Sequence, residues 1–321
     1  MGTTLSTLAL LPQGAVVAHI GDSRVYRLRQ NRLEQLTFDH SLVWEMKAAG
    51  QLSAKEEALG KIPKNVITRS LGPYADCKVD LEGPFPIAVG DTFLLCSDGL
   101  TGVVSDAELA ALMSNMPPDE AVKVMVDLGN LRGGPDNITV IIAKVISPEI
   151  ASDSNAKAFR VNTQKDRFSV HPAVWAVFGI CLLFVAVFLM TGQMMTAILP
   201  GVIALATGGY ALFNLLRGAT SGETVSEGKA FGKAPYTRTI CASGGEVSKQ
   251  LALILKQLQM GAVEQDWKVD WEQLTAMIGQ AESALGKGEH SKAVRTYGRS
   301  ICFLMDQLRN QHERGDSSVE L

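Results

Sequence analysis

The longest uncharged stretch of the sequence constrains the fold most. Residues 173–216 contain no Asp, Glu, Lys or Arg. A membrane-spanning helix needs about 20 mainly apolar residues, so this stretch has room for two such helices. Residues 191–193 supply a polar turn between them, and we expect Pro200 in the first turn of the second helix, where its missing N–H costs little. We therefore predict a transmembrane helical hairpin over 173–216. The alternative is a buried hairpin inside a large soluble domain.

Basic residues flank this stretch on both sides and are missing from its central turn. An excess of Lys and Arg marks the cytoplasmic side of a membrane protein, so we predict a cell-membrane protein with two spans and both termini in the cytoplasm. The five cysteines are scattered without a CxxC pair, which fits a reducing compartment. The flanking cations are Lys157, Arg160, Lys165 and Arg167 before the stretch, and Arg217, Lys229 and Lys233 after it.

Changes in composition divide the rest of the chain. Short β-rich runs and amphipathic helices fill residues 1–146, and polar linkers are expected over 147–172 and 217–243. Residues 244–311 are predicted to form a cytoplasmic helical domain, followed by a tail over 312–321. The net charge of −3 argues against a nucleic-acid-binding protein, which would show a basic excess.

Within residues 1–146, strands at both ends and helices between them favour an α+β sandwich over βαβ units. A capping box of Ser105 and Glu108 opens one of the helices. The predicted strands are Leu5–Leu10, Ala15–Ile20, Val25–Leu28, Thr92–Cys96 and Ile138–Val145, and the other predicted helices are Leu42–Ala49, Ala54–Leu59 and Glu120–Leu131.

Three acidic residues stand where a strand meets a turn of small residues. They are Asp22 in Gly-Asp-Ser-Arg, Asp98 in Ser-Asp-Gly, and Asp136 in Gly-Pro-Asp-Asn. Carboxylates at strand ends, beside glycines that let other groups approach, suit hard cations such as Mg²⁺ or Mn²⁺. The alternative is that each Asp only caps its turn, a common role for Asp beside Gly.

The motifs of this region resemble those of the type 2C, or PPM-family, metal-dependent serine/threonine protein phosphatases, bacterial members especially. They occur in the family's order. The matching stretches are Met1–Thr4, Gly21–Arg24, Leu36–Ser41, Val66–Gly72, Leu95–Leu100 and Gly133–Thr139.

The resemblance implies a β-sandwich flanked by helices, with a metal centre at one end, where a metal-activated water attacks a phosphoserine or phosphothreonine. Carried over by motif, Asp98 and Asp136 would be ligands of two paired Mn²⁺ or Mg²⁺ ions. Asp22 would bind a third, weaker ion together with Asp98. Asn137 would hold its turn, His40 and Arg69 would be structural, and no side-chain nucleophile is required.

The family's members carry a further segment before the position of Met1. It holds a phosphate-binding arginine, two acidic metal ligands and a histidine thought to be the general acid, and none of these is matched here. We therefore expect a truncated gene model or an internal start codon, a phosphatase β-sandwich that is only partial, and a 321-residue chain that is inactive, with no catalytic residue beyond the metal ligands.

The region after the uncharged stretch is predicted to form three amphipathic helices, the last two joined at Gly286–Gly288. One apolar face of each carries Val247, Leu251, Ile254 and Leu258; Leu274, Ile278, Ala281 and Leu285; and Ala293, Tyr297, Ile301, Leu304 and Leu308. We predict a small helical bundle that binds a partner. A cytosolic tail without a partner is the alternative.

The function predicted from these features is a membrane-anchored, metal-dependent phosphatase of phosphoserine and phosphothreonine proteins, acting with a bacterial Ser/Thr kinase in signalling. The alternative is a non-catalytic membrane adaptor whose degenerate phosphatase fold binds phosphoproteins or a helical partner.

Overall fold

The computed structural model describes residues 2–52, 62–63, 66–72, 77–152, 172–192, 194–220, 231–241 and 244–316. The chain divides into two compact units. Met1–Ala158 and Ala230–Leu321 form one, and Phe159–Lys229 forms the other. Each unit is described by itself. The predicted helix Ala54–Leu59 lies outside the described residues.

Two antiparallel sheets form the β part of the first unit. The smaller sheet has the order β1-β2-β5, and the larger has the order β7-β6-β3-β4-β8. The strands are β1 (Leu5–Leu11), β2 (Gly14–Ile20), β3 (Arg24–Arg29), β4 (Arg32–Gln35), β5 (Asp80–Phe85), β6 (Thr92–Cys96), β7 (Val140–Lys144) and β8 (Thr237–Ile240). The predicted strands are confirmed to within two residues at each end, whereas β4, β5 and β8 were not predicted.

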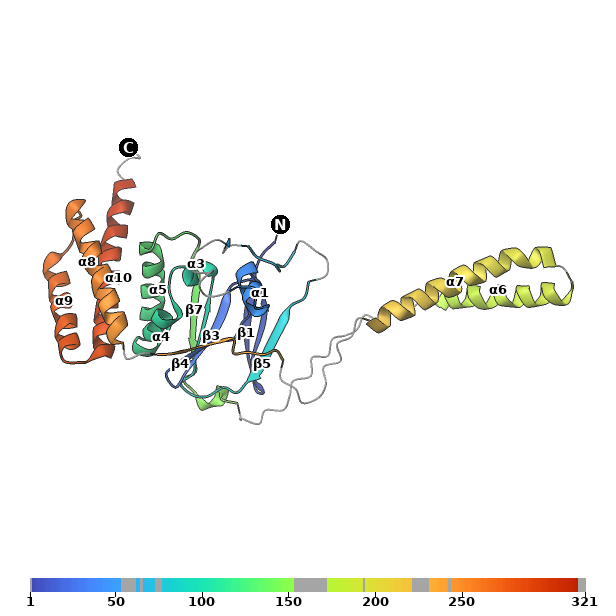
Figure 1. Ribbon diagram of the computed structural model, residues 1–321, viewed down its shortest axis with the longest axis horizontal. Helices are drawn as coiled ribbons and strands as arrows, with labels where there is room; N and C mark the ends of the chain where they lie inside the picture. Colours follow the sequence, from blue (N-terminus) through green and yellow to red (C-terminus); the bar gives the residue numbers. More distant parts are fainter. Residues whose placement is uncertain are drawn as a thin grey trace. The chain divides into compact units, whose positions relative to one another are not determined.

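A small apolar core is shared by strands of both sheets. Val17 of β2, Val25 of β3 and Phe93 of β6 are fully buried there. The side chains of β3 and β6 that point the other way, Tyr26 and Leu94 among them, join a larger core that includes the helices. The sheets and helices are therefore layered, as Figure 1 shows.

Helices lie between β4 and β7 in the sequence, and of those described all but the shortest were predicted. They are α1 (Leu42–Ala48), the short α3 (Asp98–Thr101), α4 (Asp106–Asn115) and α5 (Pro118–Leu131). The capping box is present: Ser105 Oγ accepts from the Glu108 N–H, and the Glu108 carboxylate accepts from the Ser105 N–H. A 3₁₀ turn at Pro148–Ile150 begins the range that was expected to be the first linker.

The range 217–243, expected to be the second linker, contains β8. This strand pairs with β4 from Arg32↔Ile240 to Gln35↔Thr237. Just before it, Phe231 pairs with Gly83 of β5, and buried Glu82 accepts hydrogen bonds from the Ala234 N–H and the Tyr236 hydroxyl. Backbone hydrogen bonds thus hold both ends of residues 231–241 on the sheets, so the sandwich includes chain from beyond the apolar stretch.

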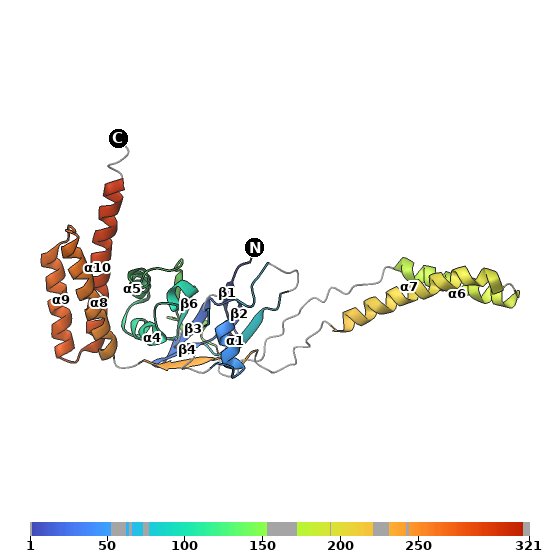
Figure 2. The ribbon, with the colours of Figure 1, turned by 45° about the horizontal axis from the view of Figure 1, so that its top comes forward.

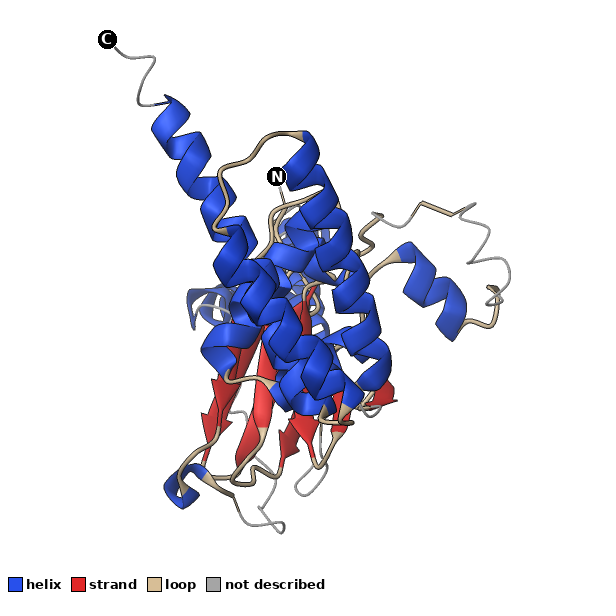
Figure 3. Cartoon of the chain, turned by 90° about the vertical axis from the view of Figure 1, so that its left-hand side faces the viewer, coloured by secondary structure: helices blue, strands red, loops and turns tan. Residues whose placement is uncertain are grey.

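Three helices complete the first unit, α8 (Gly245–Glu264), α9 (Trp271–Gly286) and α10 (His290–Asp316). Their predicted apolar faces are confirmed, because every residue of those faces is buried or half-buried. The bundle is not set apart from the sandwich, since one core runs through α4, α5 and α10. Gly298 of α10 approaches α4 and α5 so closely that a Cβ there would lie 2.4 Å from Met116. Figures 2 and 3 show the bundle on the helical side of the sheet.

The second unit contains α6 (Pro172–Met190) and α7 (Met194–Thr220), which pack against each other and meet at Gly208 and Phe178. Within the described residues, Ala173–Met190 is the one segment long and apolar enough to cross a membrane, with a mean hydropathy of 2.8, whereas the apolar part of α7, Ile198–Phe213, is shorter. A two-span hairpin stays a prediction. Pro200 lies inside α7, beyond its first turn, because the helix already begins at Met194.

Candidate metal centre

Asp22 lies in the tight turn between β2 and β3, next to a glycine that this turn requires. Gly21 has φ +112°, and a Cβ there would lie 2.3 Å from the Thr4 side chain. L-residues with a side chain rarely adopt this conformation. Asp22 itself is 8% exposed. The local sequence therefore holds its carboxylate at the end of the sandwich rather than on a mobile loop.

Asp98 and Asp136 come together because a helix and a loop approach each other at a second glycine. Asp98 is the first residue of α3, directly after β6, and Asp136 lies in the loop before β7. A Cβ on Gly99 would lie 2.5 Å from the Asn137 carbonyl oxygen and 3.1 Å from that of Asp136. The hydroxyl of Ser97 donates to the Asn137 carbonyl (3.0 Å) and accepts from the Thr139 N–H (3.0 Å), which fixes the loop.

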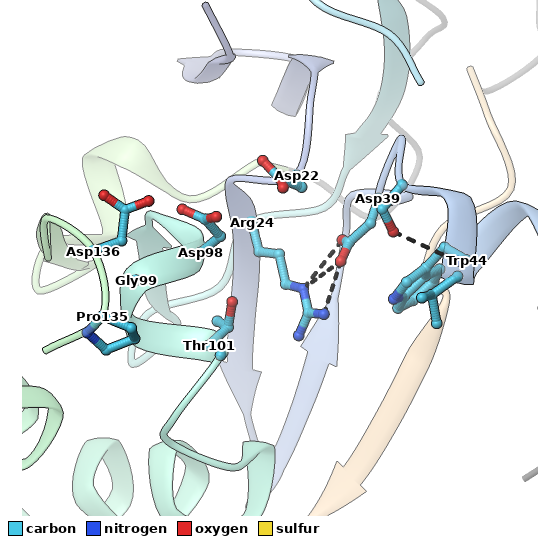
Figure 4. A pocket seen from close by; sticks show the side chains of 12 residues that line it. Asp22, Arg24, Asp39, Trp44, Asp98, Gly99, Thr101, Pro135 and Asp136 are labelled. Carbon is cyan, nitrogen blue, oxygen red and sulfur yellow. Dashed lines mark hydrogen bonds and ion pairs between the residues drawn. The ribbon is translucent and has the colours of Figure 1, made fainter. Parts of the chain in front are cut away.

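The three predicted carboxylates line one pocket of about 350 Å³. In Figure 4 they lie along one side, with Asp98 drawn between Asp136 and Asp22. The structure thus brings together residues that are up to 114 positions apart in the sequence. The lining residues are Asp22, Arg24, Asp39, Ser41, Val43, Trp44, Asp98, Gly99, Thr101, Gly102, Pro135 and Asp136.

The electrostatics of the pocket disfavour charge on Asp22. Burial, followed by the negative charge of Asp98, raises the pKa of Asp22 to about 6. Two carboxylates that repel each other in a partly buried pocket are an arrangement that a divalent cation would stabilise, because its charge offsets both. The donor set therefore fits a hard cation.

The number of ligands is small. In the described part of the chain no three His, Cys, Asp or Glu side chains are grouped closely enough to hold one ion. Mg²⁺ and Mn²⁺ prefer about six oxygen ligands. The carboxylates present could therefore supply only part of a coordination shell. The assignment of Asp22, Asp98 and Asp136 as ligands stays a prediction.

The opposite wall of the pocket was not predicted. The Arg24 guanidinium forms an ion pair with Asp39 (2.7 Å), donates to the Tyr26 hydroxyl (2.9 Å) and lies 5.6 Å from the Trp44 ring centroid. Burial raises the pKa of Asp39, and Arg24 partly offsets this effect. Arg24 could have been suspected from its place two residues after Asp22, since alternate residues of a strand share a face. Nothing in the sequence indicated Trp44, because its approach depends on the packing of α1.

No family model matches the chain. Curated relatives do: protein phosphatase PhpP of Streptococcus pneumoniae is 42% identical over 146 residues, which are 45% of this chain and 58% of that protein. A putative protein phosphatase 2C-type of Streptococcus pyogenes is 40% identical over 151 residues, 47% of this chain and 61% of the relative. This chain thus spans about three fifths of the length of the curated relatives it matches.

Solved structures match the same share of the chain. The serine/threonine phosphatase of Streptococcus agalactiae is 38% identical, covering 46% of this chain and 60% of that one, with a TM-score of 0.42. The catalytic domain of the phosphatase PstP, solved with two manganese ions, is 34% identical, covering 46% of this chain and 60% of that one, with a TM-score of 0.39. Over 45–47% of its length, this chain is homologous to PP2C-type serine/threonine protein phosphatases.

Proposed function

We propose that the first unit is part of a metal-dependent phosphatase of phosphoserine and phosphothreonine proteins. The observation that carries the proposal is the meeting of Asp22, Asp98 and Asp136 in one pocket. Asp22 follows β2, Asp98 follows β6 and Asp136 precedes β7, and the three would not share a site if each only capped its own turn. The similarity to protein phosphatases over this region supports the same reaction.

In this proposal each carboxylate has a defined task. Asp98 and Asp136 hold a pair of Mn²⁺ or Mg²⁺ ions, and Asp22 shares a weaker site with Asp98. The metals supply activation of a water molecule and neutralisation of the phosphate charge. Gly99 keeps the two principal carboxylates close together, and the Arg24–Asp39 ion pair forms the wall opposite them. Such a centre needs further oxygen ligands in addition to these three carboxylates.

We propose that α6 and α7 attach this unit to a membrane as a two-span hairpin with cytoplasmic ends. The apolar segment Ala173–Met190 of α6 supports one span. The packing of α7 against α6 supports a second span, formed by α7 beside the first. A phosphatase held at the inner face of a membrane would act on phosphoproteins there and oppose a Ser/Thr kinase. A tag at residue 1 or 321 that is reached from outside intact cells would contradict the proposal.

A non-catalytic adaptor is the second candidate, favoured by one observation. Among the described side chains, no group of three His, Cys, Asp or Glu could hold one metal ion. The pocket therefore resembles a phosphatase site that has only part of its metal ligands. In this reading the fold binds phosphoproteins without hydrolysing them.

Manganese binding is the first test. The 321-residue chain, purified in detergent, is titrated with Mn²⁺, and the loss of the EPR signal of free Mn²⁺ is measured. Asp98→Asn and Asp136→Asn should weaken binding strongly because each removes a charged ligand. Asp266→Asn is the control, since Asp266 is exposed, lies outside the pocket and has φ +52°, which Asn tolerates. Equal binding by all four proteins would contradict the metal assignment.

Hydrolysis of a phosphothreonine peptide distinguishes the two candidates. We expect little turnover from the 321-residue chain with Mn²⁺, and turnover from a chimera preceded by the N-terminal region of PhpP. One lost electrostatic contact typically costs about 10²–10³ in rate, so Asp98→Asn should nearly abolish activity of the chimera. An inactive chimera that still binds Mn²⁺ and the phosphopeptide would favour the adaptor.

A further inference from the structure

His40 contacts both backbone polar groups of the glycine that precedes Asp22. The Gly21 N–H donates to Nδ1 of His40 (3.0 Å), and the His40 N–H donates to the Gly21 carbonyl (2.8 Å). His40 is fully buried. Its contacts are therefore made without competition from water.

The direction of these bonds fixes the tautomer of the imidazole. A backbone N–H can only donate, so Nδ1 is the acceptor and carries no proton. The other ring nitrogen, Nε2, lies 2.9 Å from Oδ2 of Asp80, an acceptor, and therefore carries the proton. Asp80 is in turn held by the Arg69 guanidinium at 2.9 Å and by its place in β5. The ring is thus fixed at both nitrogens.

Gly21 depends on this contact because no side chain fixes it. Its positive φ and its closeness to Thr4 exclude a Cβ, so hydrogen bonds of its backbone set its orientation. The Gly21 carbonyl belongs to the peptide plane that leads into Asp22. Fixing that plane places the Asp22 Cα and limits the directions in which its side chain can leave the backbone. His40, which does not line the pocket, therefore acts on a residue that does.

We propose that His40 is a positioning residue of the pocket: through Nδ1 and its own N–H it fixes Gly21 and so directs the Asp22 carboxylate toward Asp98. The metal-binding consequence rests on the proposed function, whereas the effect on Gly21 does not. Groups that orient a metal ligand typically contribute about 10–100-fold to metal affinity. His40 therefore has a role beyond the structural one predicted from the sequence.

Two substitutions separate the two ring contacts. In His40→Asn the side-chain oxygen takes the place of Nδ1 and keeps an acceptor for the Gly21 N–H, while the contact with Asp80 is lost. In His40→Gln the amide nitrogen takes the place of Nε2 and keeps the donor to Asp80, while the acceptor for Gly21 is lost. Both remove one buried hydrogen bond and the ring, so both should lower the melting temperature of the 321-residue chain.

Two measurements on the 321-residue chain decide the proposal. The first is hydrogen exchange at the Gly21 amide, which should be faster in His40→Gln and near wild type in His40→Asn. The second is Mn²⁺ titration: the binding that Asp22→Asn removes should be about 10-fold weaker in His40→Gln and near wild type in His40→Asn. Leu274→Ala is the control for instability alone, because Leu274 is buried in the distant helical bundle.

The outcomes separate this proposal from the proposed function. Faster exchange in His40→Gln without Mn²⁺ binding by the wild type would support the positioning of Gly21 and contradict the metal function. Equal exchange and equal Mn²⁺ binding in both His40 variants would overturn the positioning role. Weaker binding in Leu274→Ala, equal to that of His40→Gln, would assign the effect to lost stability and overturn the proposal as well.

Discussion

At the scale of single residues, two glycines decide whether the carboxylates can meet. Gly21 accepts the backbone conformation that brings Asp22 to the end of the sandwich, and Gly99 lets the loop of Asp136 approach the helix of Asp98. Neither has a side chain that could bind anything. Because they lack a Cβ, they permit the close contacts that bring the carboxylates together. The small residues beside the three Asp therefore matter as much as the carboxylates.

Gly99→Ala should therefore damage the pocket without removing a ligand. The new Cβ would lie 2.5 Å from the Asn137 carbonyl, so the loop of Asp136 has to move. We expect destabilisation of about 1–3 kcal/mol and weaker Mn²⁺ binding. Gly279→Ala, inside α9 with nothing within 4 Å of its Cβ, is the control and should be stabilising by about 0.5–1 kcal/mol. Denaturant midpoints and Mn²⁺ titration measure both; unchanged values for Gly99→Ala would contradict this account.

At the scale of elements, α10 is attached to α5 by charge as well as by the apolar core. Arg295 and Arg299 both bind the Glu120 carboxylate, with shortest distances of 2.9 and 2.6 Å. These two hydrogen-bonded arginines lower the pKa of Glu120 to about 2. Arg309 binds Asp127 on the same face of α5. The bundle therefore has ionic contacts along its junction with the sandwich.

Glu120→Gln should lower stability in a pH-dependent way. Because the folded pKa lies below the unfolded one, the contribution of Glu120 is fully present above about pH 4.5 and is lost as the pH falls toward 2. Exposed ion pairs contribute up to about 1 kcal/mol, which corresponds to about 2–4 °C in melting temperature. Glu272→Gln, also in the first turn of its helix, is the control for the helix dipole. A difference from wild type that stays constant between pH 7 and pH 3 would argue against this ionic contribution.

The elements that could be predicted from the sequence are those with a regular apolar period. The bundle helices bury one face every 3.6 residues, and β2 and β6 are short apolar runs bounded by turns. By contrast, β8 reads Thr-Arg-Thr-Ile and β4 reads Arg-Leu-Glu-Gln, which resemble loop sequences. β4 pairs with β3 in a local hairpin, whereas β8 pairs with β4 from beyond the apolar stretch, and a local pattern does not contain such a long-range contact.

The residues of the candidate site also fall into two groups, those that the sequence could predict and those that it could not. Its carboxylates could be found because each stands beside small residues in a turn next to a strand, a local signal. Arg24, Asp39 and Trp44 are brought to the pocket by the packing of α1 and by one ion pair, which are tertiary. The role of His40 is also tertiary, since its partners Gly21 and Asp80 belong to a turn and a strand distant in the sequence.

At the scale of the whole molecule, the second unit is an insertion in the sequence of the first, and the first unit's own chain is anchored to one short stretch around the end of β5 on either side of it. Before the insertion, the Ser152 N–H donates to the Ile87 carbonyl, and the Ile87 N–H donates to the Ser152 hydroxyl. After the insertion, Phe231 and Gly83 each donate a backbone N–H to the other's carbonyl. An extended chain rises about 3.3 Å per residue, so these anchors are within about 13 Å along the strand direction. Ends this close are typical of sites where a domain tolerates insertion.

Replacing residues 159–229 by a Gly/Ser linker should therefore leave the first unit folded. A flexible linker of about eight residues has a mean reach of about 15 Å, enough to join the two ends. We expect one cooperative thermal transition, in a protein that needs no detergent. The matched deletion of 159–241 also removes β8 and the contacts of Glu82, and it should unfold at a clearly lower temperature. Equal melting temperatures for the two deletions would contradict an integral role for β8.

The position of β8 also has a consequence for the order of events during synthesis. Its partner β4 leaves the ribosome about 200 residues earlier, which at about 5–20 residues per second corresponds to about 10–40 s. During that time the backbone groups along one edge of β4 have no strand to pair with, and an unpaired edge is a template for aggregation. The apolar helices α6 and α7 emerge before β8, so a newly made chain exposes both of them while the pocket-bearing domain still lacks one of its strands.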